Sequence, residues 1–255
     1  MSEQKALGIL ERGLWSPDQL VAHSIVEREA VKLYPGDAEA IEANWNGILA
    51  KNPKAFAGPT VRLLGRHRLD DKLILEVAPS DYKEGYFLSF LGVAMVPVTT
   101  DGFIALQEPV ASVAATIGGG TRVPGCTPSD SLIIGEVIRK MKKEFGAEVL
   151  PEHLSILGLI EARPPIAKFH HGLVVKVSMP CVKDQLAESW QGAEDKWQGN
   201  LEFLEMRRGL PTFGSASGSN YQKLNRQSLL ILTMVIESEL GGTLVNDWGN
   251  TLNWW

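Results

Sequence analysis

The chain has 255 residues, of which 44% are hydrophobic and 22% charged, and its formal net charge is −5 at pH 7. These proportions are ordinary for a soluble globular protein, and the length suits one large domain or one domain with an elaborated end. The acidic balance argues against a nucleic-acid-binding protein, because it implies no broad cationic surface. The only cysteines are Cys126 and Cys181, too few for a disulfide framework or a structural zinc site, which favours a reducing compartment.

The start of the chain shows no secretory signal, since no basic stretch precedes an apolar one. No uncharged apolar run reaches the length of a membrane span. We therefore expect a cytoplasmic or nuclear protein that does not bind membranes.

Two helices are expected near the N-terminus. Ser16 to Gln19 reads as a capping box, with Ser as the N-cap, proline in the first turn and glutamine three residues on, which predicts a helix to about Leu33. After Pro35 and Gly36, Asp37 begins a second predicted helix that ends at about Leu49. Residues 1–58 are thus expected to form a helical N-terminal arm packed on the following domain.

Strand-like and helical segments then follow in the order strands, helix, strands, helix. A turn at Thr99–Gly102 joins two of the strands. Helices are expected over the segment before Gly146, near 182–191 and near 220–240. This order predicts an α/β fold, an α/β/α sandwich around a mixed sheet, over residues 59–240. The predicted strands are 61–65, 72–78, 91–98, 102–108, 154–162, 172–179 and 201–206.

The most informative stretch is IGGGTRVPGCTPSDSLIIGEVIRKMKKEFGAEV, residues 117–149. It resembles the Nudix box, G-x5-E-x7-R-E-U-x-E-E-x-G-U, in which U is a bulky apolar residue. Four positions of the motif match: Arg139 as the R, Met141 as the U, Glu144 as the second glutamate of the pair and Gly146 as the last glycine. Lys140 and Lys143 fall where the family carries two carboxylates, and the upstream glutamate has no counterpart.

The resemblance implies a site for a small molecule with a diphosphate linkage. Nudix enzymes gather Mg2+ with helix glutamates and use it to polarise the diphosphate and to generate a nucleophilic water. Glu144 is therefore the first candidate for a metal or water contact. Glu136, at an unmatched position, is a second carboxylate. Arg139 is expected to orient an acidic neighbour.

The two lysines leave three interpretations open. A 3.6-residue period places Glu136, Lys140, Lys143 and Glu144 on the polar face of this helix, opposite an apolar one. Lys140 and Lys143 would neutralise part of the charge of a bound phosphate. Alternatively, the site binds its ligand without hydrolysing it. In the third interpretation, the face is a solvated ladder of ion pairs between residues four apart.

Three segments outside the box extend the resemblance to the branch of the family that hydrolyses UDP-glucose and UDP-galactose. They are 40–63, 80–89 and, more loosely, 192–205, so the likeness covers most of residues 35–240. That branch also has an irregular box with an insertion between glycines and helix. The resemblance implies that Tyr82 stacks on a uracil or sugar face and that Lys83 contacts a phosphate.

Further candidates lie before and after the box helix. Gly119 and Gly120 allow the backbone to approach a ligand, and Arg122 is placed to reach a phosphate. Of the neighbours His170 and His171, at most one faces the site, because adjacent strand residues point to opposite faces; we select His171 as an acid, base or binding group. Carboxylates elsewhere are candidates to rebuild a metal site; they are Glu84, Glu108 and Glu161.

The C-terminal tail, residues 241–255, ends in the aromatic residues Trp248, Trp254 and Trp255. Large aromatic side chains at a chain end usually dock on protein, so we expect the tail at a homodimer interface or over the pocket mouth. Two functions remain open for the whole chain. One is hydrolysis of a diphosphate linkage, as in a nucleoside diphosphate sugar, with an atypical metal site. The other is a Nudix fold that has lost this hydrolysis and binds a nucleotide or metabolite, or catalyses a different reaction on a small metabolite.

Overall fold

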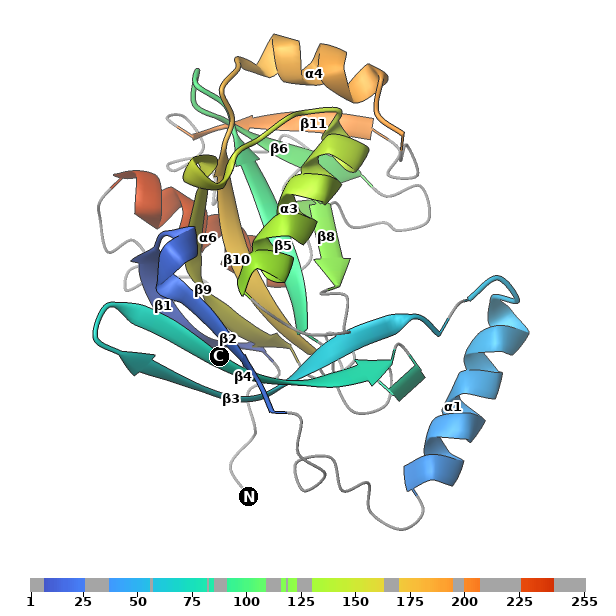
Figure 1. Ribbon diagram of the computed structural model, residues 1–255. Helices are drawn as coiled ribbons and strands as arrows, with labels where there is room; N and C mark the ends of the chain where they lie inside the picture. Colours follow the sequence, from blue (N-terminus) through green and yellow to red (C-terminus); the bar gives the residue numbers. More distant parts are fainter. Residues whose placement is uncertain are drawn as a thin grey trace.

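The computed structural model describes eleven stretches of the chain: residues 7–25, 37–55, 57–81, 83–84, 91–108, 116–117, 119–122, 130–162, 170–194, 200–206 and 226–240. Two sheets and several helices make up this part (Figure 1). The larger sheet contains β1 (Leu7–Trp15), β5 (Leu91–Val98), β6 (Phe103–Glu108), β7 (Thr116–Ile117), β8 (Gly119–Arg122), β9 (Leu154–Ala162), β10 (His170–Ser178) and β11 (Asn200–Glu205). The smaller contains β2 (Leu20–Ser24), β3 (Pro59–Leu69) and β4 (Lys72–Asp81). The helices are α1 (Asp37–Lys51), α3 (Asp130–Phe145), α4 (Lys183–Gln191) and α6 (Arg226–Leu240), with 3-10 turns η1 (Pro17–Gln19) and η2 (Pro151–His153).

The larger sheet is mixed. Its strands follow the order β1-β9-β10-β5-β6-β11, with β8 paired to β5 and β7 paired to β6. β10 and β5 run parallel, whereas the other pairs are antiparallel. The α/β class with a mixed sheet is therefore confirmed, and the arrangement is compatible with the expected sandwich.

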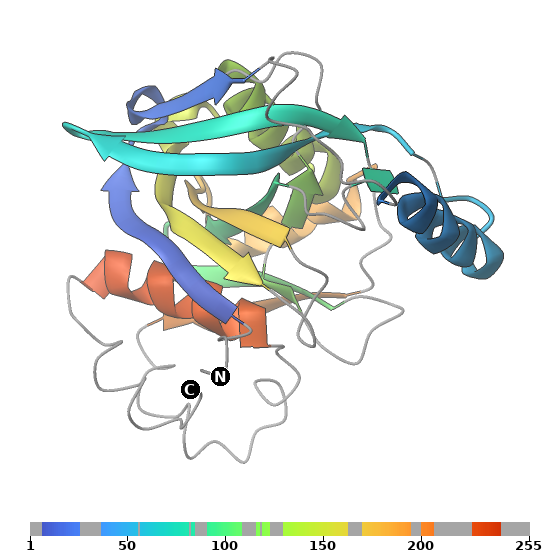
Figure 2. The same ribbon diagram turned by 90° about the horizontal axis from the view of Figure 1, so that it is seen from below.

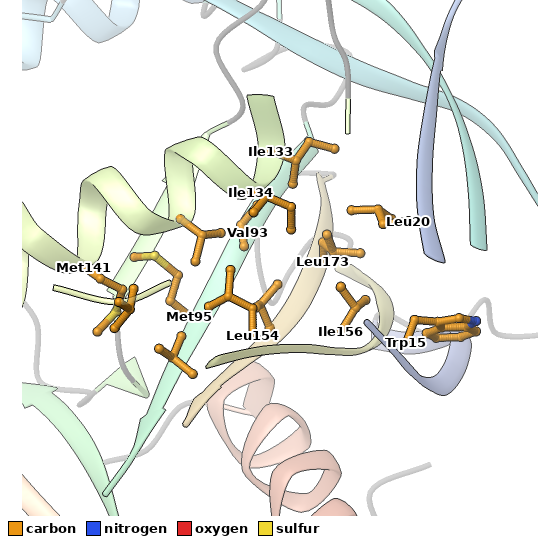
Figure 3. Packing of buried hydrophobic residues seen from close by; sticks show 14 of the residues in the cluster. Trp15, Leu20, Val93, Met95, Ile133, Ile134, Met141, Leu154, Ile156 and Leu173 are labelled. Atoms are coloured by element: carbon orange, nitrogen blue, oxygen red, sulfur yellow. The ribbon is translucent and has the colours of Figure 1, made fainter. Parts of the chain in front are cut away.

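The two faces of the larger sheet carry separate cores, because alternate strand residues point to opposite sides. On β5, Val93 and Met95 pack with Ile133 and Met141 of α3 (Figure 3). The neighbouring Val96 packs in the other core, with residues of α6. α3 and α6 thus cover opposite faces of this sheet.

The smaller sheet shares the α3 side of the molecule. Leu20 of β2 and Leu75 of β4 belong to the same core as α3. Figure 2 shows β3 and β4 on one side of the larger sheet and α6 on the other. Side chains also join the two sheets: Arg66 Nε donates to the carbonyl of Leu10 on the edge strand β1, and Arg68 donates to the carbonyl of Arg12.

The expected helix from Ser16 to Leu33 is wrong. The capping box is present, since the Ser16 backbone N–H donates to Gln19 Oε1 at 2.9 Å, but it closes only the 3-10 turn η1. The chain then continues as β2, in which Leu20 pairs with Leu73 of β4. Burial of Leu20 and Ala22 on one side of β2 fits a strand, so pairing with β4 overrides the local helix signal. Residues 26–33 lie outside the described part.

The N-terminal segment is consequently not a helical arm in the sense expected. β1 lies at the edge of the larger sheet and β2 lies in the smaller one. Among the described residues of 1–58, only α1 is helical beyond a single turn. β1 has no counterpart among the strands predicted from sequence. Its centre carries Glu11 and Arg12, which pair with Arg68 and Glu237 and mask the apolar alternation.

Most other predicted elements are confirmed. The predicted strand 154–162 coincides with β9, and the helix expected from Asp37 is α1. The turn at Thr99–Gly102 is closed by a hydrogen bond from Gly102 N to Thr99 O, with Gly102 at φ 82°. Among the described helices, none has both the length and the apolar character needed to cross a membrane. The tail 241–255 with its three tryptophans lies outside the described residues.

Candidate functional site

The glycine stretch before the box helix is a strand. Gly119 and Gly120 belong to β8 and pair with Met95 and Ala94 of β5. β8 then runs toward Arg122, which pairs with Gly92. α3 packs on the face of the sheet that carries Val93 and Met95 of β5. Gly119 and Gly120 therefore lie level with Met95, the residue against which Met141 packs in Figure 3. The structure places these glycines near the C-terminal half of α3. Gly118 and the side chain of Arg122 lie outside the described part.

α3 is amphipathic, as its spacing predicts. Ile133, Val137, Met141 and Phe145 are buried against the sheets. This face anchors the helix, so the polar residues beside it are held at fixed positions relative to β5 and β8. The charged residues from Glu136 to Glu144 comprise four basic and two acidic side chains, an excess of positive charge.

The first acidic residue of this group is held by an arginine. Arg139 donates from Nε and Nη2 to the two carboxylate oxygens of Glu136, each at 2.7 Å. This is the bidentate geometry that a guanidinium makes with a carboxylate. Glu136 is 9% exposed at its side chain, whereas Arg139 is 54% exposed, so the arginine fixes a nearly buried carboxylate from the solvent side. Arg139 thus orients an acidic neighbour, although the neighbour is one turn upstream.

The second acidic residue is held by a lysine. Lys140 Nζ donates to Glu144 Oε1 at 3.0 Å, between positions four apart on the helix. The Glu144 side chain has no exposed surface, and that of Lys140 is 18% exposed. The ion pair between Lys140 and Glu144, one step of the ladder expected from the spacing, is therefore not solvated. A buried carboxylate is costly without a positive partner, which gives Lys140 a stabilising role.

These two ion pairs decide how well the α3 carboxylates suit Mg2+. The cation prefers several oxygen ligands in near-octahedral geometry. Glu136 faces the guanidinium of Arg139, and Glu144 faces the ammonium of Lys140. A divalent cation would have to displace both basic groups, and it would be repelled by them on approach. As arranged here, the pair of carboxylates does not fit Mg2+.

Gly146, the motif's last glycine, has a structural explanation. It adopts φ 66° immediately after α3, and its N–H donates to the carbonyl of Lys142 at 3.0 Å. A Cβ at this position would lie 2.3 Å from the backbone oxygen of Ser189, at the end of α4. Only glycine combines this conformation with such close packing. The residue ends α3 and allows α4 to approach it.

Basic residues at the end of α3 differ in their surroundings. Lys142 is exposed and pairs with Glu148 at 2.8 Å; that hydrogen bond raises the pKa of Lys142 and lowers the pKa of Glu148. Lys143 is half-buried. Cations near a helix C-terminus are also favoured by the helix dipole, which accounts for part of this basic cluster without any ligand.

Lys83 lies away from α3 and pairs with Glu42 of α1. Figure 1 shows α1 beside the segment that follows β4, well separated from α3. The structure therefore engages Lys83 with the N-terminal region rather than bringing it to the box helix. Tyr82 and the side chain of Glu108 lie outside the described residues. Glu84 accepts a hydrogen bond from Ser80 at 2.9 Å near the end of the smaller sheet.

His171 is brought together with Glu161. The two residues are partners across β10 and β9, and His171 Nε2 lies 3.6 Å from Glu161 Oε1. Sequence reasoning selected both residues but did not pair them, because their contact depends on the strand register. The available signal was that Glu161 lies near the end of one predicted strand, 154–162, and His171 directly before the next, 172–179. The side chain of His170 lies outside the described part.

A scan of the sequence against protein-family models finds no matching family. A search of curated proteins likewise finds no match.

Proposed function

We propose that the protein binds a small molecule with a diphosphate group, such as a nucleoside diphosphate sugar, on the face formed by α3 and β8. The proposal starts from the likeness of this segment to the Nudix box. It is supported by the neighbouring positions of the glycine strand and the basic half of α3. A lysine ammonium has three donors, so Lys140 is able to contact a phosphate while it holds Glu144.

One observation favours one of the two functions that the sequence left open. The two glutamates of α3, Glu136 and Glu144, are each neutralised by a basic side chain of the same helix. This favours a Nudix-like protein in which Lys140 and Lys143 replace the charge of a metal ion at the phosphates. Such a protein serves as a nucleotide- or metabolite-binding protein, or catalyses a different reaction on a small metabolite.

Hydrolysis of the diphosphate linkage with an atypical metal site is the second candidate. The observation in its favour is the Arg139–Glu136 fork, which holds one carboxylate in a defined orientation. Such an orientation is what a catalytic or metal-binding carboxylate requires. This function needs Lys140 to release Glu144, or carboxylates from elsewhere to complete the site.

Phosphorus NMR separates the two candidates. Purified protein is incubated with UDP-glucose and a panel of other diphosphates, in Mg2+, Mn2+ or EDTA. The favoured function predicts intact diphosphates with every metal and ligand-induced thermal stabilisation that persists in EDTA. Metal-dependent release of UMP and a sugar phosphate would instead establish the hydrolase. A homodimer, expected from the Trp-rich tail, is tested separately by the molar mass of the chain with and without residues 241–255.

A further inference from the structure

A row of four residues crosses neighbouring strands at one end of the larger sheet. Glu161 of β9 pairs with Gly8 of β1 on one side and with His171 of β10 on the other. His171 in turn pairs with Leu91 of β5. We call Gly8, Glu161, His171 and Leu91 the cross-strand row. Its two polar members are 14% and 11% exposed at their side chains, Glu161 and His171 respectively.

The cross-strand row faces the same side as α3. Leu159 and Leu173 are paired with each other and belong to the core beneath α3, whereas the next residue along β9, Ile160, belongs to the opposite core. One further step of alternation returns Glu161 and His171 to the α3 side. Leu91 also belongs to the α3 core.

The row is closed at one end and open at the other. Leu91 is fully buried and forms an apolar wall beside His171. Gly8 has no side chain, and a Cβ added there would meet no heavy atom within 4 Å. A directly paired residue of an antiparallel sheet points to the same face, so this free space lies beside the Glu161 carboxylate. The polar pair therefore borders an open space.

The geometry points to a binding site for a neutral, hydroxyl-bearing group, a sugar or a ribose, at the cross-strand row. The inference rests on the proposed diphosphate-binding function. A carboxylate accepts hydrogen bonds and repels phosphate, so it selects a hydroxyl over an anion. The 3.6 Å between Nε2 and Oε1 exceeds the usual range for a direct hydrogen bond. A hydroxyl group both donates and accepts, so it is suited to join an imidazole and a carboxylate.

The position of the row complements the basic part of α3. Gly92 pairs with both Gly172 and Arg122, so the row lies where β8 leads toward the start of α3. In Figure 3, Ile133 lies near Leu173 and Met141 lies near Met95, so Lys140 and Lys143 belong to the far end of the helix. A nucleoside diphosphate sugar is elongated, with an anionic centre and neutral hydroxylated ends. Its diphosphate would bind near Lys140 and Lys143, and its hydroxylated part would bind at the cross-strand row.

Calorimetric titration with two probes tests the inference in EDTA. UDP-glucose carries the hydroxyl groups, and inorganic pyrophosphate carries only the anionic part. Gly8→Leu fills the open space without removing a polar group, and Glu161→Ala removes the acceptor. Gly47→Leu is the matched control, because Gly47 lies on α1 and a Cβ there also meets no atom within 4 Å. Thermal unfolding of each variant verifies that it is folded.

We expect Gly8→Leu and Glu161→Ala to weaken UDP-glucose binding roughly 10- to 100-fold, the effect of losing a hydrogen bond to a charged group. Gly8→Leu would prevent that bond by blocking access to the Glu161 carboxylate, and Glu161→Ala would remove the carboxylate itself. Pyrophosphate affinity should be unchanged in both variants, and Gly47→Leu should match the unmodified protein with either probe. Unaltered UDP-glucose affinity in folded Gly8→Leu and Glu161→Ala would overturn this inference alone. Failure of the unmodified protein to bind either probe would overturn the proposed function and, with it, this inference.

Discussion

Lys140 Nζ lies 3.0 Å from Glu144 Oε1, and the Glu144 side chain is fully buried while the lysine reaches the surface. The ammonium thus stands between a buried carboxylate and the solvent. In the Nudix box, which this segment resembles, the position matched by Lys140 carries a carboxylate, so the lysine has the opposite charge. The relationship explains both why α3 is a poor Mg2+ site and why its carboxylate is tolerated in the core.

Removing the lysine should destabilise the fold. Lys140→Ala should lower the free energy of unfolding by about 3–5 kcal/mol, because it leaves the buried Glu144 without this ammonium. Lys140→Met combined with Glu144→Met should recover much of the loss, since an apolar pair needs no charge compensation. Urea denaturation measures all three proteins. Lys142→Ala, an exposed lysine on the same helix, is the control, and an equally small effect at Lys140 would disprove the stabilising role.

Two glycines of the same segment should respond in opposite directions to alanine. Gly146→Ala should destabilise the protein by about 1–2 kcal/mol or more, because left-handed backbone is unfavourable for alanine and its Cβ would meet Ser189. Gly135→Ala should stabilise it by about 0.5–1 kcal/mol, since Gly135 lies within α3 with open space around it. Thermal melting of both variants provides the comparison. A stable Gly146→Ala protein would contradict the account of the helix end.

The β5–β6 turn should contribute stability that depends on pH. The Thr99 hydroxyl donates to Asp101 Oδ1 at 2.6 Å and lowers the pKa of that carboxyl below its ordinary value of 3.8. A lowered native pKa means that the contribution is complete above pH 3.8 and is lost as the pH falls through the lower native value. The stability difference between the unmodified protein and Asp101→Asn should therefore shrink below that pH. A difference that stays constant across the acidic range would show that the hydrogen bond does not favour the charged form.

The sequence predicted elements whose periodicity agrees with their final packing. β9 coincides with its predicted range because its apolar residues serve both cores, and α3 follows its 3.6-residue spacing. The capping box of Ser16 and Gln19 wrongly predicts a long helix, because such a box determines only one turn. The following residues form a strand because Leu20 pairs with Leu73, which is far away in the chain. Strand β1 was missed because Glu11 and Arg12 find their ion-pair partners on other elements.

Some contacts of the candidate site are likewise predictable from the sequence, and others are not. Residues three and four apart on a helix are neighbours, so the spacing of Lys140 and Glu144 already allowed their ion pair. The complete burial of Glu144 was not predictable, because it depends on how α3 packs against the rest of the fold. The pairing of Lys83 with Glu42, and of His171 with Glu161, depends on contacts between separate elements. Helical spacing alone gives no information on such contacts.

Calorimetric titration of inorganic pyrophosphate in EDTA tests most directly whether basic side chains of α3 replace a metal. The unmodified protein should bind it without any divalent cation. Lys143→Ala should weaken binding by about 1.5–3 kcal/mol, the typical loss for a charged hydrogen bond, and a folded Lys140→Ala protein should show a similar loss. Lys142→Ala, whose side chain is exposed and paired with Glu148, should bind as the unmodified protein does. Pyrophosphate binding that requires Mg2+ and is unaffected by changes at Lys140 and Lys143 would contradict the account.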